Sequence, residues 1–555
     1  MTSDQATLLL ASLLNRISSD RSRYAGLVSD QEIEAIAAFA RPMEQPKEIP
    51  DSSPATPLPP LTTPPHLTLE SVGAPAQNPD VILCLDFGTA KSKAFAARDV
   101  GDGEPDLFDI EIGNLDVDLD GSVFSVASAL WIDHSGRVFV GSEALRQSES
   151  AIGEERARID SLKQFISQAN EPKEVRSTVL TKEEDPFRSG LTHEHALLLY
   201  LGYLTDLSLA CLEGRGFSRL TRRRFALPCW EEGQRAWASE YLGSLVARAQ
   251  IVADTFRGRW KAGLGIREVV AVCDATRQHA NALRTLVDEV PDAKAALAQR
   301  WGGVLEPIAS ASARMYAEHK LDRKLMLVAD IGAGTTDVAL FWLVLDGDDR
   351  RAFPVSGTTR ALRMAGDHLD HALLRLLLDK GNIEPRLARR AETKLRLEGL
   401  RRLKERLYID GSVQARLIND ALVTVTRDEF EGNPLVSAFN AQLTGLVKGV
   451  IDTLDPSWAL HAERITLVLS GGGSTLPAAS NLTNVEGTVG GRVARFRLAP
   501  LVPEGIPDGL KSEYPRLAVA LGGSLDTIAE RSALDQCPAG SVPHGPLERF
   551  PTRGL

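Results

Sequence analysis

The chain has 555 residues, of which 43% are hydrophobic and 25% are charged, and its formal net charge is −11. This length is too great for one hydrophobic core, so we expect two to four domains or subdomains. The acidic balance argues against broad electrostatic binding of nucleic acid, and the ordinary apolar content indicates a globular protein.

The cysteines and the longest apolar runs limit the location of the protein. The five cysteines share no CxxC or Cys/His spacing, so we expect neither a disulfide framework nor a zinc site, and a reducing compartment fits. No apolar run reaches the length that spans a bilayer. The apolar run at 7–14 follows an acidic start without basic residues, which does not resemble a signal peptide. We therefore expect a cytoplasmic protein without membrane contact.

The first 79 residues differ from the rest of the chain. Residues 1–41 carry apolar side chains at helical spacing, which predicts an N-terminal helical segment. Prolines recur through residues 42–79, and such a stretch forms neither a helix interior nor a sheet, so it predicts an extended linker. A proline-rich ligand for a recognition domain is the alternative interpretation.

The main body begins at about residue 80 and alternates strand and helix patterns, which indicates the α/β class. In its first part the patterns predict strands at 81–86, 93–98, 123–132, 137–140, 225–229 and 269–273. They predict helices there at 153–169, 191–210, 231–257 and 276–299. In the second part we expect a strand hairpin at 325–344, a helix-rich and Arg-rich segment at 367–408, a strand at 465–469 and a last helix near 515–530.

One strand-turn-strand phrase occurs twice, at residues 81–92 and 325–337. Each copy has an apolar run, an Asp, then glycine and a hydroxyl residue. The Asp at the end of each strand, Asp86 or Asp330, can hold Mg²⁺, usually through water. The glycines let backbone N–H groups point at phosphate oxygens. The repeat therefore predicts two like-built domains with the phosphate tail of a nucleotide between them.

Further phrases carry a family resemblance. In chain order, the phrases Leu85–Thr89, Glu306-Pro307, Asp330–Asp337 and Ser470–Pro477 resemble those of the actin, heat-shock-chaperone and sugar-kinase ATPase superfamily. Five more phrases make the chain most similar to the nucleotide-binding domain of the seventy-kilodalton, DnaK-type chaperones: Val140–Arg146, Ile159–Lys163, Leu227–Arg235, Gly366–Asp370 and Leu517–Gly522. The resemblance covers about residues 80–530. It implies an actin-like, two-lobed ATPase fold with duplicated ribonuclease-H-like cores and inserted subdomains.

The resemblance also implies a domain division. We expect an N-terminal helical segment at 1–41, a Pro-rich linker at 42–79, lobe I at 80–320, lobe II at 321–535 with an inserted subdomain at about 367–430, and a flexible tail at 536–555. Because few residues follow the closing helix, we expect no peptide-binding domain of the kind that a full chaperone carries. The N-terminal helices and a helical expansion at 234–306 are extra elements, and we expect a protein partner to dock on one of them.

The resemblance implies that the chain binds ATP or ADP with Mg²⁺. Asp86 and Asp330 would hold the hydrated ion, Lys163 would stabilise the developing phosphoryl charge, and Glu306 and Asp337 would orient the attacking water. The nucleotide would contact both hairpins, a basic helix and a glycine run, through Gly88, Thr89, Lys93, Gly332, Gly334, Thr335, Thr336, Gly366, Lys404, Gly471, Gly472, Gly473 and Ser474.

Some of these residues have other interpretations. Lys163 could be a solvated helix lysine, and Lys93 is its rival, because it lies seven residues after Asp86, as the phosphate-binding lysine does in actins. Glu306 could cap a turn before Pro307. The Arg-rich run at 386–406 is typical of a solvated helix face whose acidic and basic residues pair at i,i+4 spacing.

The residues that the family uses on the base side, to contact the nucleotide's adenosine, depart from the family pattern. The family's ERxKR becomes Arg401–Glu405, Thr475 replaces an arginine, and Arg516 replaces an aspartate. On the phosphate side, Ala333 is a small change in a glycine turn. These differences predict weakened ATP affinity or an altered base preference.

We interpret the chain as a chaperone-like ATPase module that binds and slowly hydrolyses Mg-ATP. Its hydrolysis would switch the closure of the lobes and regulate a protein partner. The alternatives are a bacterial actin-like filament former, a small-molecule kinase of the same superfamily, and a nucleotide-binding scaffold that does not hydrolyse.

Overall fold

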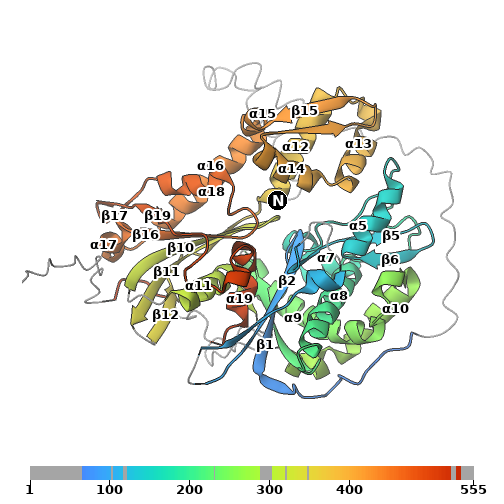
Figure 1. Cartoon of the computed structure of the whole chain (residues 1–555), viewed down its shortest axis with the longest axis horizontal. Helices are drawn as coiled ribbons and strands as arrows, with labels where there is room; N and C mark the ends of the chain where they lie inside the picture. Colours follow the sequence, from blue (N-terminus) through green and yellow to red (C-terminus); the bar gives the residue numbers. More distant parts are fainter. Residues whose placement is uncertain are drawn as a thin grey trace, which may run out of the picture. The chain divides into compact units, whose positions relative to one another are not determined.

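A computed structural model describes residues 65–101, 104–116, 122–230, 232–287, 303–318, 322–346, 349–526 and 533–538. All of them belong to one compact unit that spans residues 58–555, and their fold is mixed α/β (Figure 1). The predicted helices at 1–41, most of the predicted linker at 42–79 and most of the predicted tail at 536–555 lie outside the described residues. The linker's described end has Leu67, Val72 and Ala76 packed against the first hydrophobic core.

The first sheet is built on the first copy of the repeated phrase. Its strands are β1 (Asn78–Asp86), β2 (Lys91–Arg98), β3 (Asp106–Asp109), β4 (Ser125–Ala127), β7 (Thr221–Leu227) and β9 (Val304–Leu305). Their order is β3-β2-β1-β7-β9, and β4 also pairs with β2. β1, β2 and β3 pair antiparallel in sequence, whereas β7 lies parallel to β1 and β9 parallel to β7.

The second sheet repeats this plan around the second copy. Its strands are β10 (Asp322–Ile331), β11 (Thr336–Asp346), β12 (Asp349–Pro354), β13 (Arg360–Leu362), β16 (Ile465–Ser470) and β19 (Phe496–Leu498). Their order is β12-β11-β10-β16-β19, and β13 also pairs with β11. The first three strands are antiparallel, and the next two continue parallel to β10. The two sheets therefore share both strand order and strand direction.

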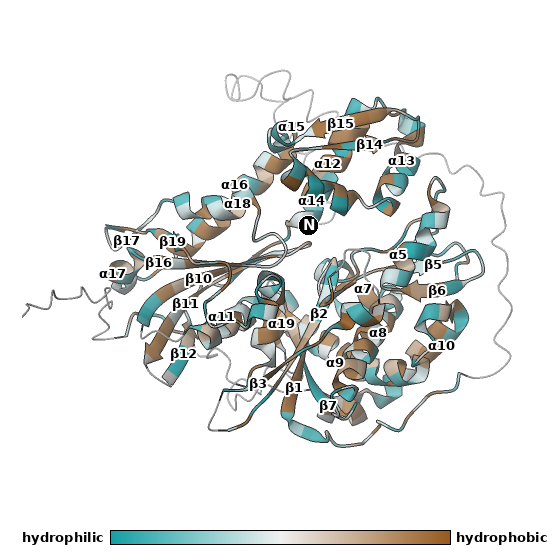
Figure 2. Ribbon diagram, viewed as in Figure 1, coloured by the Kyte–Doolittle hydropathy of each residue, from teal (hydrophilic) through white to brown (hydrophobic). Residues whose placement is uncertain are grey.

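Helices α8 (His193–Glu213) and α9 (Glu232–Phe256) pack together in the core of the first half (Figure 1). Thr192 caps α8 by accepting a hydrogen bond from the His195 backbone N–H, as an N-cap hydroxyl does. α8 is long and apolar enough to cross a membrane, but 89% of its most apolar stretch is buried inside the protein. Figure 2 shows hydrophobic residues along α8 and along β1 and β2, so α8 is a core helix and its burial is compatible with a soluble protein.

The remaining elements connect these cores. In the first half they are α4 (Ile112–Asp116), β5 (Leu130–Ile132), β6 (Arg137–Val140), α5 (Ser142–Ser148), α6 (Gln164–Ser167), α7 (Pro172–Ser177), β8 (Leu264–Gly265), α10 (Ile266–Ala275) and the 3₁₀ segments η1 (Glu149–Ala151), η2 (Trp260–Ala262) and η3 (Thr276–Leu286). In the second half they are α12 (Gly366–Lys380), α13 (Pro385–Leu397), α14 (Leu400–Asp410), β14 (Ser412–Arg416), β15 (Leu422–Thr426), α15 (Arg427–Glu431), α16 (Pro434–Asp452), η5 (Pro456–Trp458), α17 (Ala459–Ala462), α18 (Pro477–Ser480), η6 (Asn481–Asn484), β17 (Thr488–Val489), β18 (Arg492–Val493) and η7 (Asp508–Leu510).

Two helices tie the halves together. α11 (Glu306–Ala317) precedes the second hairpin, and its Ala311 and Met315 pack on the second sheet. α19 (Tyr514–Ser524) ends the described fold and packs on β1 and β2 of the first sheet. α11 and α19 also pack on each other, and a backbone carbonyl of Ala309 lies where a Cβ on Gly522 would be. A glycine at 522 is what permits this close crossing.

Most predicted elements are confirmed, but four differ. The predicted strand at 269–273 is wrong, since this β-branched run lies in α10, whose buried side chains Ile266, Val269, Val272 and Cys273 follow a helical period. The predicted helix at 153–169 is mostly irregular and contains only the short α6. The predicted strand at 123–132 is split into β4 and β5. The predicted helix at 276–299 is 3₁₀ as far as Leu286, and its end lies outside the described residues.

Candidate functional site

The first hairpin presents a carboxylate paired with an ammonium group. Asp86 ends β1 and lies directly opposite Lys93 of β2, so the seven-residue spacing is a cross-strand pair. The Lys93 Nζ donates to Asp86 Oδ2 at 3.1 Å. Between them, Gly88 lies so close to the chain that an added Cβ would be 2.0 Å from the Lys91 carbonyl oxygen. Ser128 Oγ holds the Gly88 carbonyl at 2.8 Å.

The second hairpin has two carboxylates at the matching positions. Asp330 near the end of β10 lies opposite Asp337 of β11. Asp330 also lies opposite Ser470 of the parallel strand β16, whose hydroxyl donates to Asp330 Oδ1 at 2.8 Å. Burial, and then the negative charge of Glu306, raise the pKa of both Asp330 and Asp337 well above the usual range.

Lys163 and Glu306 form a buried ion pair between two distant parts of the chain. Glu306 is the first residue of α11, and Lys163 is the residue immediately before α6. The Lys163 Nζ donates a hydrogen bond to Glu306 Oε1. Both side chains are only 6% exposed. Burial alone would lower the pKa of Lys163, but the carboxylates of Glu306, Asp86 and Asp337 raise it above its usual value. The interpretation of Lys163 as a solvated helix lysine is therefore wrong.

Asp337 joins the second hairpin to the first half. Its Oδ1 accepts the Cys229 backbone N–H at 2.6 Å, and its Oδ2 accepts the Thr335 hydroxyl at 2.9 Å. Cys229 follows β7 of the first sheet. Asp337 is completely buried, so these two donors fix its carboxylate at the place where the halves meet.

The two glycine turns touch each other. An added Cβ on Gly334 would lie 2.7 Å from the Thr89 hydroxyl, so the second turn packs on the first hairpin there. The backbone N–H of Gly366 donates to the Gly332 carbonyl at 3.3 Å, which places the start of α12 on the same turn. A larger residue than glycine at 334 would push the two hairpins apart.

The glycine run at 471–473 follows β16 and packs against the end of β10. Gly471 has φ +82°, and an added Cβ would lie 2.4 Å from the Ile331 carbonyl oxygen. The Gly473 N–H donates to that same carbonyl at 2.8 Å. Gly472 is exposed with nothing within 4 Å of an added Cβ, whereas Ser474 is buried. The run thus leaves an open backbone surface beside Asp330.

The structure brings most predicted site residues together. Coulombic interactions connect Asp86, Lys93 and Glu306 with Asp330, so four carboxylates and two ammonium groups share one region. Two further predicted residues, Thr336 and Lys404, also have partners within the protein. The Thr336 hydroxyl is buried and donates to the Met364 carbonyl at 2.9 Å. The Lys404 Nζ lies 2.8 Å from the Gly366 carbonyl oxygen and 2.7 Å from Asp370 Oδ1.

Sequence reasoning missed several supporting residues. Ser470 lies in a quoted phrase but its bond to Asp330 depends on strand register. Gln234 donates to the carbonyls of Ile166, Ser167 and Ala169, and it accepts from Arg363 Nη2 at 3.0 Å. Gln234 also lies in a quoted phrase, but nothing in the sequence indicates that it holds the segment after Lys163.

The residues fit a hydrated divalent cation better than a directly ligated one. Among the described residues, no group of three or more His, Cys, Asp or Glu side chains could hold a metal ion. The region nevertheless has more carboxylates than ammonium groups, and carboxylate oxygen is the donor that Mg²⁺ prefers, with several waters retained. The excess of buried negative charge is what a divalent cation would offset.

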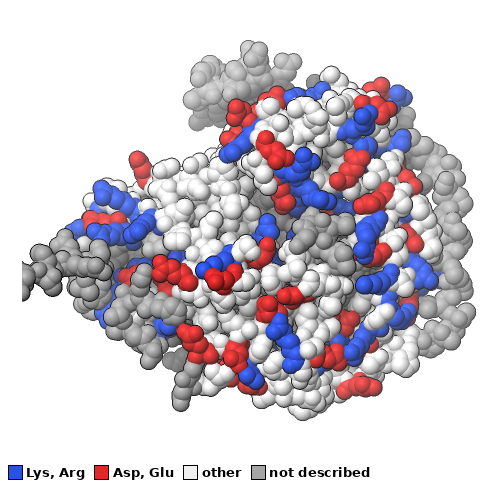
Figure 3. All heavy atoms as spheres, viewed as in Figure 1, with Lys and Arg blue, Asp and Glu red and all other residues white. Residues whose placement is uncertain are grey.

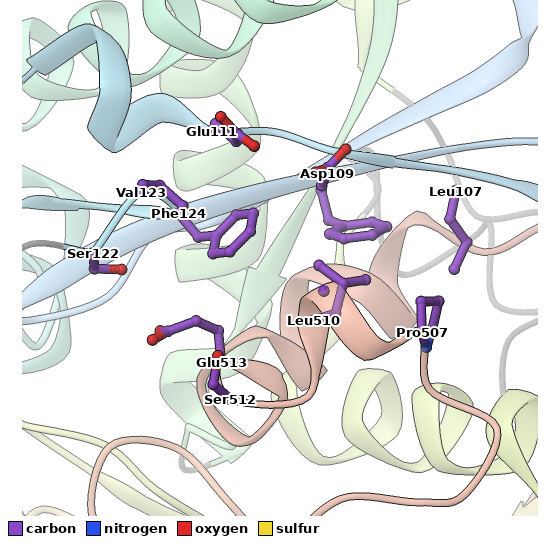
Figure 4. A pocket seen from close by; sticks show the side chains of 12 residues that line it. Leu107, Asp109, Glu111, Ser122, Val123, Phe124, Pro507, Leu510, Ser512 and Glu513 are labelled. Carbon is purple, nitrogen blue, oxygen red and sulfur yellow. The ribbon is translucent and has the colours of Figure 1, made fainter.

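The described residues also enclose a cavity away from these carboxylates. It has a volume of about 640 Å³ and lies between the first sheet and the segment before α19, and Figure 4 shows Phe124 and Leu510 facing each other in it. Asp109, Glu111 and Glu513 also line it. A second cavity of about 270 Å³ lies between α14 and β14. Neither cavity is lined by the hairpin carboxylates, so the candidate site rests on side-chain chemistry and not on cavity size.

No protein-family model matches the chain.

Proposed function

We propose that the chain is a chaperone-like ATPase module that binds Mg-ATP between its two halves and hydrolyses it slowly. The observation that carries the proposal is that Asp86, Asp330 and Asp337 of two hairpins of like topology share one region with the ion pair of Lys163 and Glu306. The shared strand order of the two sheets supports an actin-like, two-lobed fold with duplicated ribonuclease-H-like cores.

Each residue has a role that its surroundings support. Asp86 and Asp330 would hold hydrated Mg²⁺, which when bound neutralises phosphate charge. The Lys163 ammonium would face a terminal phosphate oxygen, since its raised pKa keeps it protonated at neutral pH. The glycines of the turns at Gly88–Thr89, Gly332–Thr335 and Gly471–Gly473 would let the backbone lie close to phosphate and ribose. The N–H groups of Gly332, Gly471 and Gly473 donate to backbone carbonyls of the protein.

Asp337 is the residue best suited to receive a proton. Burial and then the Glu306 carboxylate raise its pKa to about 8, and a divalent cation bound beside it would lower that pKa again, so that the carboxylate would be ionised when Mg-ATP is bound. In the proposed reaction, water attacks the γ-phosphorus and gives a proton to Asp337. The bond from that phosphorus to the bridging oxygen breaks, and ADP and phosphate leave. Glu306 orients Lys163 through their ion pair.

The surroundings of Lys404 and Arg401, on the helix expected beside the adenosine, support weaker or altered recognition of adenine. Lys404 is held by Gly366 and Asp370, and Arg401 Nη2 donates to Asp367 Oδ1 at 2.8 Å. These cations on α14 are therefore engaged within the protein. A nucleotide titration that gave tight, ATP-selective binding would count against this part of the proposal.

The output we propose is regulation of a protein partner in the cytoplasm, with the N-terminal helices or the expansion at 234–306 as docking surface. A bacterial actin-like filament former is the second candidate, because Lys93 lies at the actin lysine position and contacts Asp86. Light scattering after addition of Mg-ATP distinguishes the two, since only a filament former polymerises.

Measured ATP turnover tests the central claim. We expect the wild-type chain to hydrolyse ATP and Asp330→Asn to lose about 100-fold or more of that rate, because one charged group of the phosphate site is gone. Asp322→Asn is the matched control, since Asp322 begins the same strand, at the opposite end from Asp330, and pairs with Lys324 at 2.9 Å. Equal near-zero rates in wild type and Asp330→Asn would refute hydrolysis.

A further inference from the structure

Asp367 joins three parts of the candidate site. It is the second residue of α12, and its backbone N–H donates to the Ala333 carbonyl at 2.7 Å, in the middle of the second glycine turn. Its Oδ2 accepts from Ser161 Oγ at 3.0 Å and from Gln164 Nε2 at 2.9 Å. Its Oδ1 accepts from Arg401 on α14. One residue thus bonds to the glycine turn, to a segment of the first half and to the base-side helix.

Ser161 and Gln164 flank Lys163 in a tight turn. The Gln164 backbone N–H donates to the Ser161 carbonyl at 2.9 Å, which brings both side chains to one side of the turn. They meet the same oxygen of Asp367, while the Lys163 side chain is buried with Glu306. Asp367 therefore binds one side of the segment 161–164, and the Lys163 side chain leaves that segment toward the buried Glu306.

This segment has little regular structure of its own. α6 is one turn long, although the sequence predicted a helix over 153–169. Its position depends on side chains from elsewhere: Gln234 holds three of its carbonyls, and Asp367 holds its start. Asp367 is the member of this set that comes from the second half and is also bonded to the glycine turn.

We propose that Asp367 is a positioning residue, which fixes the Lys163 segment of the first half against the glycine turn at 332–335 of the second half. The role of the segment in phosphate chemistry rests on the proposed function, but the positioning itself does not. When the hydrogen bonds of Asp367 to Ser161 and Gln164 break, the distance between Lys163 and the glycine turn is no longer fixed. The contact therefore couples the closing of the two halves to the placement of Lys163.

Other contacts between the halves provide a control. Arg389 on α13 pairs with Glu183 at 2.9 Å, and its side chain is 69% exposed. This ion pair links the same two halves without touching the Lys163 segment. Glu183→Gln should therefore weaken a contact between the halves while leaving the segment as it is.

Amide hydrogen exchange without nucleotide tests the positioning. We expect peptides covering 160–168 to exchange about tenfold faster or more in Asp367→Ala, because two hydrogen bonds to a carboxylate are lost. Ser161→Ala combined with Gln164→Leu removes the same bonds from the other side and should give the same increase. Glu183→Gln should exchange like wild type there. An unchanged rate in the double variant, or an equal increase in Glu183→Gln, overturns the proposal.

The kinetic readout separates positioning from binding. If the chain hydrolyses ATP, we expect Asp367→Ala to lower kcat about tenfold while KM for ATP changes less than about twofold, with partial rescue in Asp367→Asn, which keeps one acceptor oxygen. A rise in KM alone would assign Asp367 to nucleotide binding and overturn the positioning role. If wild type shows no turnover, the proposed function fails, and the exchange experiment still decides the role of Asp367.

Discussion

The two hairpins have the same topology but opposite cross-strand chemistry. Seven residues after its first Asp, the first hairpin places Lys93 opposite Asp86, whereas the second places Asp337 opposite Asp330. The first pair joins opposite charges, whereas burial and then the negative charge of Glu306 raise the pKa of both carboxyls of the second pair. The same backbone plan therefore carries an ion pair in the first hairpin and two neighbouring carboxyl groups in the second.

The largest expected effect comes from removing this asymmetry at Asp337. Asp337→Asn keeps an oxygen for the Cys229 N–H but cannot receive a proton, so we expect turnover of ATP to fall about 100-fold or more. Lys93→Gln, at the matching position of the first hairpin, should reduce turnover far less. Single-turnover hydrolysis measures both. Similar losses in the two variants would contradict the assignment of the base to the second hairpin.

The glycine of each hairpin tests how closely the two copies agree. Gly88→Ala should cost about 3 kcal/mol of unfolding free energy, because the new Cβ would be 2.0 Å from a backbone oxygen that has little room to move. Gly332→Ala should cost less than about 1 kcal/mol, since its nearest atom, the Thr335 carbonyl oxygen, is 3.2 Å away. Urea unfolding measures both. Equal losses would mean that the turns are more alike than their contacts indicate.

The Asp86–Lys93 pair should act as a balanced unit. Lys93→Met leaves the Asp86 carboxylate, only 8% exposed, without its cation, and we expect a loss of about 2 kcal/mol. Adding Asp86→Asn should recover most of that loss, because neither charge then remains buried. Urea unfolding of both single variants and the double variant completes the cycle. A double variant no more stable than Lys93→Met would show that the pair does not act as a unit.

The sequence could predict the hairpins and the residues at their ends, because each is encoded within one short phrase. Apolar runs, an Asp and glycines gave the strands at 81–86 and 325–344 and placed Asp86 and Asp330 correctly. The helix at α10 was missed because its valines favour a strand locally, and the helical period of its buried residues is visible only in the fold. The packing of these side chains in the fold therefore favours the helix over the strand.

The supporting bonds could not be predicted, since they join residues far apart in the chain. The Cys229–Asp337 and Ser161–Asp367 hydrogen bonds depend on how the halves meet. Surface charge gives no guide either, because Figure 3 shows acidic and basic side chains mixed on the face in view. Of the predicted i,i+4 pairs in the Arg-rich segment, Glu392–Arg396 and Lys394–Glu398 are confirmed.

The smallest expected effect concerns Ser470, which has no counterpart in the first sheet at the last paired position, where Phe225 of β7 lies opposite Leu85. The Ser470 hydroxyl donates to the charged form of Asp330 and so opposes the rise in its pKa. Ser470→Ala should raise that pKa further and cost about 1 kcal/mol of unfolding free energy at neutral pH. Ser310, whose hydroxyl lies 3.1 Å from that of Ser470, is the control position.

The sign of the pH dependence follows from the direction of these shifts. An acid whose pKa is higher in the folded state than in the unfolded state binds its proton more tightly when folded. Stability therefore falls as pH rises from the ordinary Asp value of 3.8 through the raised pKa of Asp330 and Asp337. Urea unfolding from about pH 4 to about pH 8 should show this fall extending to higher pH in Ser470→Ala and becoming shallower in Asp337→Asn. In Ser310→Ala the Ser470–Asp330 bond is retained, so its profile should follow that of wild type. A Ser470→Ala profile parallel to wild type would mean that strand pairing, and not this hydroxyl, sets the charge state of the second hairpin.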